Sequence, residues 1–164
     1  MTVGENLKPR TQNPGYSYRN LLLWQKAQEL ALEVVKVVTA LPADPAARVI
    51  GRQVMASASS IGANIAEGHG RFTPGAHRNH LSIAKGSACE TDGWLDLLHR
   101  AGYIDSEAEG RLHTSCDELI RMLTAKILQM ERLDRSKGAR LKEETALYTA
   151  EDYAADQQVP GSRF

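Results

Sequence analysis

The segment from residue 53 to residue 71 constrains the fold more than any other, because its side chains sort into stripes that only a helix produces. Polar residues recur at alternating intervals of four and three, at Gln53, Ser57, Ser60, Asn64, Glu67 and Arg71, which places them on one helix face. An apolar stripe lies beside them, at Ile50, Val54, Ala58, Ile61 and Ile65. Many remaining positions are small, including Gly62, although glycine destabilises a helix by about 1 kcal/mol relative to alanine. A helix that keeps this glycine needs room for a neighbouring backbone.

Apolar periodicity predicts three further amphipathic helices. The predicted start signals are Asn20 for the first helix, Asp44 with Pro45 for the second, Thr73 with Pro74 for the third, and a capping box of Ser106 and Glu109 for the fourth. The predicted ends are Leu41 before Pro42, the glycines Gly68 and Gly70, and Gly102. The first helix carries an apolar arc of about 160°, wide enough to touch two neighbours.

Short connections between four such helices predict an all-α fold, an antiparallel up-down-up-down four-helix bundle. Residues 1–19 combine proline, glycine and polar side chains without a period and are predicted to be a flexible arm. The bundle is predicted to span residues 20–135. Beyond it the periodicity weakens, so residues 136–164 are predicted to form a flexible or partly helical tail.

The charge balance bears on partners and on location. Twenty basic and twenty acidic residues cancel, so nucleic-acid binding would need a local patch rather than a field of the whole protein. Cys89 and Cys116 lie in helical patterns without a disulfide or zinc spacing, and are expected to be reduced, mostly buried thiols. Neither a signal peptide nor a membrane span is recognisable, so the protein is expected to be cytoplasmic, without a membrane partner.

Three stretches, LLLWQKAQELAL, SIGANIAEGHGR and HLSIAKGSACE, resemble the family of 23S rRNA intervening-sequence proteins, whose genes occur within insertions in bacterial 23S rRNA genes. The resemblance covers residues 18–133. It implies an antiparallel four-helix bundle that assembles into a ring-like homo-oligomer, a pentamer. The family is named for gene position rather than for a reaction. It is distantly akin to the accessory protein of diversity-generating retroelements, which binds a reverse transcriptase and nucleic acid.

The chain departs from the family pattern on its second helix. The family usually has two arginines where this chain has Met55 and Ala56, and a proline where it has Gly62. The resemblance therefore implies a different partner for Glu90, with Arg52 as the candidate.

The polar stripe has two interpretations. As a structural seam that fixes helix register, it would comprise Gln53, Ser60, Asn64, Glu67, Ser87 and Glu90. As a ligand or RNA contact, it would be built on Asn64, Glu67, His69 and Arg71. The first interpretation is favoured, because buried polar groups often specify register.

A nucleic-acid or partner patch is predicted from five cations with few acids between them, Arg48, Arg52, Arg71, Arg78 and Lys85. Repetition around a ring would strengthen such a patch through avidity. The wide apolar arcs support subunit contacts.

The sequence shows no set of residues typical of a catalytic site. A di-metal bundle needs Glu-x-x-His motifs, which are missing, and His77 with His80 supplies only half of a metal site. Gly68 and Gly70 lack the preceding strand and following Lys-Ser/Thr of a phosphate loop. We therefore expect no enzyme, no metal, no cofactor and no small-molecule substrate. The leading hypothesis is an oligomeric scaffold or adaptor whose partner is RNA, a ribonucleoprotein or another protein. The alternative is an RNA-binding accessory module.

Overall fold

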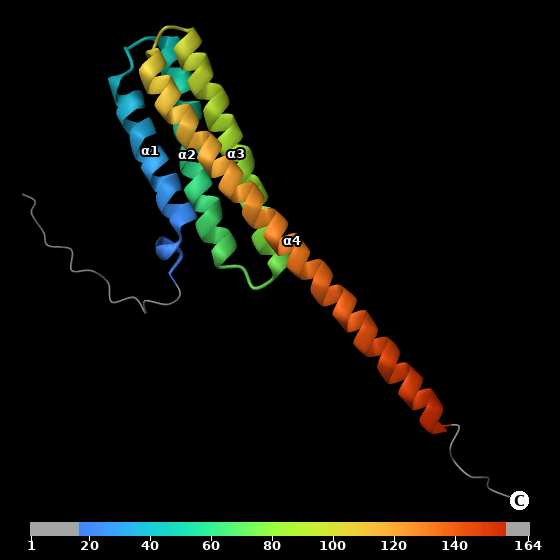
Figure 1. Ribbon diagram of the computed structural model, residues 1–164. Helices are drawn as coiled ribbons and strands as arrows, with labels where there is room; N and C mark the ends of the chain where they lie inside the picture. Colours follow the sequence, from blue (N-terminus) through green and yellow to red (C-terminus); the bar gives the residue numbers. More distant parts are fainter. Residues whose placement is uncertain (1–16, 157–164) are drawn as a thin grey trace, which may run out of the picture. The chain divides into compact units, whose positions relative to one another are not determined.

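The computed structural model describes residues 17–156, with side chains described through residue 142, and every regular element in this range is helical (Figure 1). A 3-10 turn, η1, spans Tyr18–Asn20, and four helices follow: α1 (Leu22–Ala40), α2 (Pro45–His69), α3 (Pro74–Arg100) and α4 (Ser106–Asp156). Within 17–156 no strand occurs, which confirms the all-α prediction. Most of the predicted N-terminal arm, residues 1–16, lies outside the described residues.

The predicted caps of α2 and α3 are confirmed. The Asp44 carboxylate accepts bonds from the backbone N–H of Ala46 and Ala47, at 2.8 and 3.0 Å. The Thr73 hydroxyl accepts one from Ala76 N–H at 3.2 Å. In both helices proline occupies the first position, where its missing N–H removes nothing from the helix.

The end of α3 is also as predicted. Gly102 has φ +77°, and its N–H donates to the His99 carbonyl at 2.8 Å while Tyr103 N–H donates to the Leu98 carbonyl at 2.9 Å. These two bonds form a Schellman motif, which satisfies carbonyls that the helix leaves open.

Two predicted N-caps are wrong, although the fourth helix starts at Ser106 as predicted. Asn20 belongs to the 3-10 turn, and α1 begins only at Leu22, without a side-chain cap at Leu21. At the fourth helix, Ser106 is the first helical residue, and the cap is the Asp105 carboxylate, which accepts from Ala108 N–H at 2.7 Å. The aspartate one position earlier supplies an equally good hydrogen-bond acceptor, and its carboxylate caps the helix in place of the serine hydroxyl.

The chain divides into two compact units, residues 1–124 and residues 125–164, with the boundary inside α4. In the first unit, all four helices contribute side chains to one core. The largest side chains with less than 2% exposure are Leu30, Val34, Val54, Ile61, Ile65, Leu81, Thr91, Leu95, Leu98, Cys116, Leu119 and Leu123. In the second unit α4 continues to Asp156. The predicted tail begins inside this helix, and its flexibility stays a prediction.

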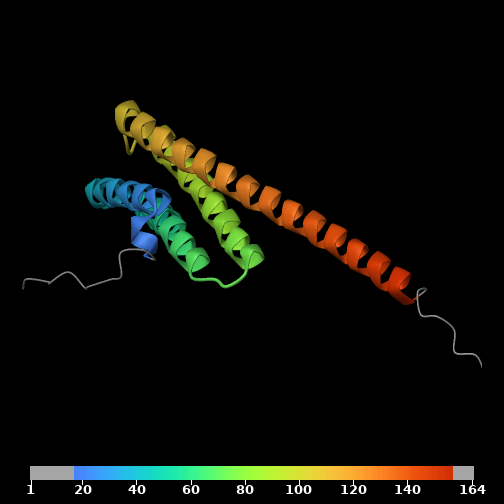
Figure 2. The same cartoon turned by 60° about the horizontal axis from the view of Figure 1, so that its bottom comes forward.

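Two of the glycines in α2 face a neighbouring helix. A Cβ on Gly62 would stand 3.8 Å from the Ala27 Cβ and 2.3 Å from the Gln28 amide nitrogen, both on α1. A Cβ on Gly68 would stand 3.0 Å from the His80 Cβ of α3, beyond the short loop that Figure 2 shows between α2 and α3. The small side chains of α2 therefore admit a neighbouring helix on each side.

Candidate functional site

The buried part of the predicted polar seam is a set of hydroxyl groups between α2 and α3. Ser60 Oγ and Ser87 Oγ are 2.9 Å apart, and Thr91 Oγ1 lies 3.0 Å from Ser57 Oγ. Ser57, Ser87 and Thr91 are 4%, 8% and 0% exposed. Each buried hydroxyl group has a partner, so it escapes the free-energy penalty of an unsatisfied polar group.

The seam continues towards the loop through a second group of side chains. The Asn64 amide nitrogen donates to Ser60 Oγ at 3.1 Å, and its amide oxygen lies 3.2 Å from His80 Nδ1. Because that oxygen can only accept, His80 carries its proton on Nδ1. Its Nε2 then accepts from Arg71 Nε at 3.1 Å, and Arg71 pairs with Glu67. One connected network thus joins Ser87 to Glu67.

Two predicted members of the seam lie outside this network. Gln53 and Glu90 are both exposed, and the Glu90 carboxylate accepts from Trp94 Nε1 on its own helix, at 3.2 Å. Among the described residues of the single chain, no ion pair joins Arg52 to Glu90 or to any other carboxylate. The pairing of Glu90 with Arg52 stays a prediction.

Sequence reasoning missed two members of the seam, His80 and Thr91. A signal for both existed, because His80, Ser87 and Thr91 are spaced seven and four residues apart and share one face of α3. The polar stripe on α2 gives a clearer signal, because its members recur at every interval of three or four residues.

The five predicted cations do not form one patch. Arg48 and Arg52 line a hollow beside α1, whereas Arg71 lies at the loop end of α2, bonded to His80 and paired with Glu67. Arg78 and Lys85 are seven residues apart on α3, on a face turned about 160° from that of Ser87. A role for these cations in nucleic-acid binding stays a prediction.

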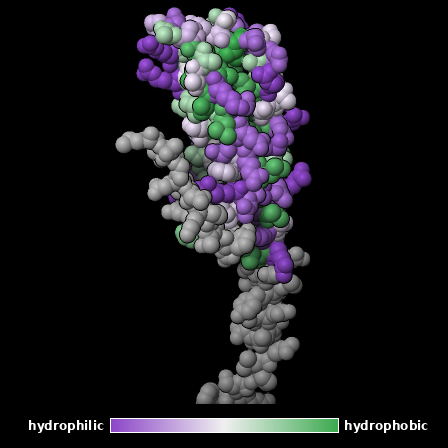
Figure 3. All heavy atoms as spheres, turned by 90° about the vertical axis from the view of Figure 1, so that its left-hand side faces the viewer, coloured by the Kyte–Doolittle hydropathy of each residue, from purple (hydrophilic) through white to green (hydrophobic). Residues whose placement is uncertain are grey.

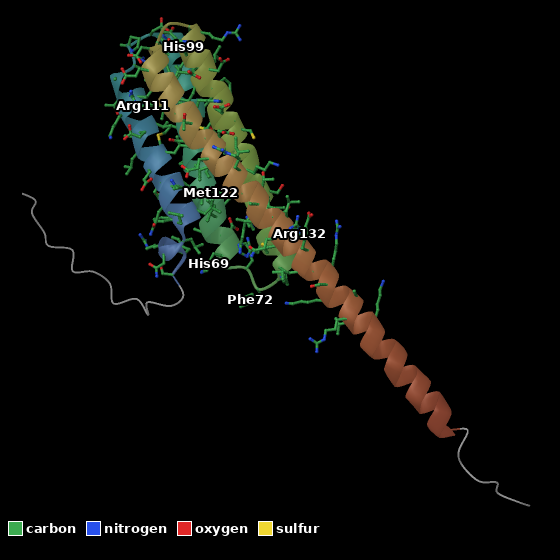
Figure 4. The ribbon with its side chains drawn as sticks, in the orientation of Figure 1. His69, Phe72, His99, Arg111, Met122 and Arg132 are labelled. Atoms are coloured by element: carbon green, nitrogen blue, oxygen red, sulfur yellow. The ribbon has the colours of Figure 1, made fainter. Side chains whose placement is uncertain are left out.

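The titratable groups give little support to catalysis. Burial raises the pKa of the Cys116 thiol to about 12, so the reactive thiolate is scarce at neutral pH. Both His80 nitrogens are engaged within the seam. Across the described residues, no three His, Cys, Asp or Glu side chains converge as metal ligands would. His69 lies at the end of α2, close to the loop that carries Phe72 (Figure 4).

Charged contacts outside the seam connect other helices. His113 on α4 lies 2.8 Å from the Asp92 carboxylate on α3, and this hydrogen bond raises the histidine pKa. Lys26 on α1 donates to Glu118 on α4 at 2.8 Å, which raises the lysine pKa. The Tyr103 hydroxyl donates to Asp44 at 2.7 Å; together with the backbone bond from Ala47, the larger cause, it lowers the Asp44 pKa. These contacts hold helix ends and faces in place.

An open groove follows the junction of α1 and α2 on the side away from the seam. It consists of two hollows of about 620 and 430 Å³ that share Met55 and Ser59 as lining residues. Its walls include Val35 and Val38 of α1, and its floor includes small residues of α2, namely Gly51, Ala56, Ser59, Gly62, Ala63 and Ala66. Figure 3 views the side on which α1 lies in Figure 1, and hydrophobic side chains reach the surface there among hydrophilic ones. No helix of the described range is sufficiently long and apolar to cross a lipid bilayer.

The chain is similar to proteins of one known family. A solved structure of a protein of unknown function from the S23 ribosomal protein family of Bacteroides thetaiotaomicron superimposes with a TM-score of 0.62 and 31% identity. The match covers 65% of this chain and 98% of that one. No functionally curated protein matches the chain. The model of the 23S rRNA-intervening sequence protein family matches residues 19–125, which is the bundle with its seam and its groove, and the chain therefore belongs to that family.

Proposed function

We propose that this protein is a non-enzymatic, homo-oligomeric scaffold or adaptor. In this proposal the four helices follow an up-down-up-down order, and copies close into a ring, with five copies expected from the family resemblance. The observation that carries the proposal is the open apolar groove between α1 and α2.

The groove is accompanied by apolar side chains that the bundle itself does not bury. Of the wide apolar arc predicted for α1, only Ala27, Leu30 and Val34 are buried. Leu32 is 61% exposed and Val35 is 43% exposed, and both line the groove. Single exposed apolar residues are ordinary, but neighbouring ones along a hollow are typical of a protein interface.

Sedimentation velocity of the full chain across micromolar concentrations tests the proposal. The expected result is a species whose mass is a multiple of the 18.0 kDa chain, five copies for the pentamer. A single species at the mass of one chain at every concentration would contradict the oligomer.

A second candidate function is nucleic-acid binding as an accessory module, with RNA or a ribonucleoprotein as partner. The observation that favours it is Phe72 at the α2–α3 loop, whose relative exposure of 104% leaves the ring free to stack on a base. Arg71 adjoins it in sequence. This candidate predicts RNA binding that weakens with salt. Replacing the five predicted cations by glutamine should reduce the salt dependence, and Phe72→Ala should weaken binding by about 1–3 kcal/mol. An absence of binding at low salt rejects it.

A further inference from the structure

The outer face of α3 carries a narrow heptad stripe that no other described helix covers. Ile83, Glu90 and Leu97 are spaced seven residues apart, and Gly86 and Gly93 follow the first two by three residues. Ile83 and Leu97 are 45% and 40% exposed, and Glu90 is also exposed. We call these five residues the α3 ridge. Positions with this spacing face a partner helix in a coiled coil.

The two glycines of the ridge face no neighbouring helix among the described residues. Within the described part of the chain, no neighbouring atom lies within 4 Å of where a Cβ would stand on Gly86 or Gly93. Glycine inside a helix costs about 1 kcal/mol relative to alanine. This contrasts with Gly62 and Gly68, where a Cβ would meet a neighbouring helix.

The α1–α2 groove has the complementary character. It is concave and mostly apolar, and it contains Arg52, which lacks an ionic partner among the described residues. The ridge carries two exposed apolar side chains, Ile83 and Leu97, with the Glu90 carboxylate midway between them. The groove runs along α2 from Ala47 to Ala66, about 28 Å at 1.5 Å per residue. The ridge from Ile83 to Leu97 is about 21 Å long, which is shorter than the groove.

We propose that the α1–α2 groove of one copy receives the α3 ridge of the next copy, with Arg52 facing Glu90 across the contact. The inference rests on the proposed oligomer and adds to it the two surfaces and their register. Because groove and ridge are different surfaces of one chain, the contact is head-to-tail, the kind that closes into a ring when the rotation allows. A single charge among apolar heptad positions fixes which register the helices adopt.

A charge-swap experiment tests the pairing in the full chain. Arg52→Glu and Glu90→Arg each place like charges across the contact, and each should weaken assembly at least about tenfold. The double variant restores opposite charges and should recover the wild-type mass. Mixing the two single variants should restore assembly only in part, because contacts between unlike variants carry opposite charges but a ring of five cannot close without one contact between identical variants.

Two controls make the outcomes distinct. Lys85→Glu changes a charge on a different face of α3 and should leave the mass unchanged, and circular dichroism should show every variant folded. A monomeric wild type would reject the proposed oligomer itself. A wild-type oligomer whose mass is insensitive to Arg52→Glu and Glu90→Arg would reject this interface and leave the oligomer standing.

Photo-crosslinking identifies what occupies the groove. A benzophenone side chain at position 59, which lines both hollows, should capture peptides of α3. Mixing isotope-labelled and unlabelled chains should show that they come from another copy. Capture of residues 1–16 of the same chain, or of an unrelated region, would overturn the assignment.

Discussion

Helix α2 has two contact regions, and they are chemically opposite. Towards α3 it presents the hydroxyl, amide and charged groups of the seam, which form hydrogen bonds within the chain. Towards the outer side of α1 it presents small and apolar residues that leave a groove open. The seam is complete in one chain and the groove is not. The seam should therefore govern the stability and register of the fold, while the groove should govern association.

The groove should be the more sensitive region when association is measured. Val35→Asp places a carboxylate on a groove wall that is 43% exposed in the single chain. Folding should change little, but burying the charge against a second copy should cost about 3 kcal/mol or more of association free energy. The measurement is sedimentation velocity beside thermal unfolding. Loss of folding with retained mass would reverse the roles of the two regions.

The seam should be the more sensitive region when folding is measured, and Gly68, which packs against the seam residue His80, tests this in a matched pair with Gly62. At Gly68 an added Cβ would meet the His77 carbonyl at 3.3 Å and the His80 Cβ at 3.0 Å, which cannot easily move. Gly68→Ala should destabilise the fold by about 1–2 kcal/mol, overpacking outweighing the gain in helix propensity.

Gly62→Ala, on the groove side of α2, is the matched control for Gly68→Ala. There the nearest atom is the far end of the flexible Gln28 side chain, which can rotate away. The change should be neutral or stabilise by up to about 1 kcal/mol. Chemical denaturation compares the two variants, and equal effects would contradict the difference between the regions.

The helix caps and the polar and apolar stripes show how much of the structure can be predicted from the sequence alone. Asp44, Thr73 and Gly102 could be predicted because caps are local and each depends on one side chain or one φ angle. The error at Ser106 came from two adjacent residues able to cap, a competition that local rules do not resolve. The seam required a partner helix: Asn64 could be placed on a face, but its bond to His80 depends on how α2 and α3 are offset. The wide apolar arcs indicated subunit contacts, but the place of the open groove could not be predicted, because an arc does not show which of its residues the chain itself covers.

The hydroxyl pair of the seam should contribute a smaller amount to stability. Thr91→Val keeps the shape of a fully buried side chain and removes both the contact with Ser57 Oγ and the bond that the hydroxyl donates to the Ser87 carbonyl of its own helix. Ser57 can still donate to the Val54 carbonyl, so the expected loss is about 1 kcal/mol. The matched control is Ser59→Ala on the groove side, whose exposed hydroxyl bonds only its own helix and should matter by less than about 0.5 kcal/mol. If Thr91→Val proves as stable as the wild type, the seam fixes register without adding stability.

The smallest effect on folding stability is expected for the exposed pair of His113 on α4 and Asp92 on α3. The hydrogen bond to Asp92 raises the pKa of His113 above its ordinary value of 6.5, so the charged form is favoured in the folded chain. A raised pKa stabilises the fold below the unfolded value, and that contribution disappears as the pH rises through the folded pKa.

NMR titration of His113 should show the elevated pKa, and Asp92→Asn should return it towards 6.5. The stability difference between the two proteins should shrink as the pH rises. Because the His113 side chain is 57% exposed, solvent screens the pair, and its effect should remain below that of Thr91→Val. An equal or larger effect at low pH would mean that exposed ion pairs, rather than the buried seam, hold α3 against its neighbours.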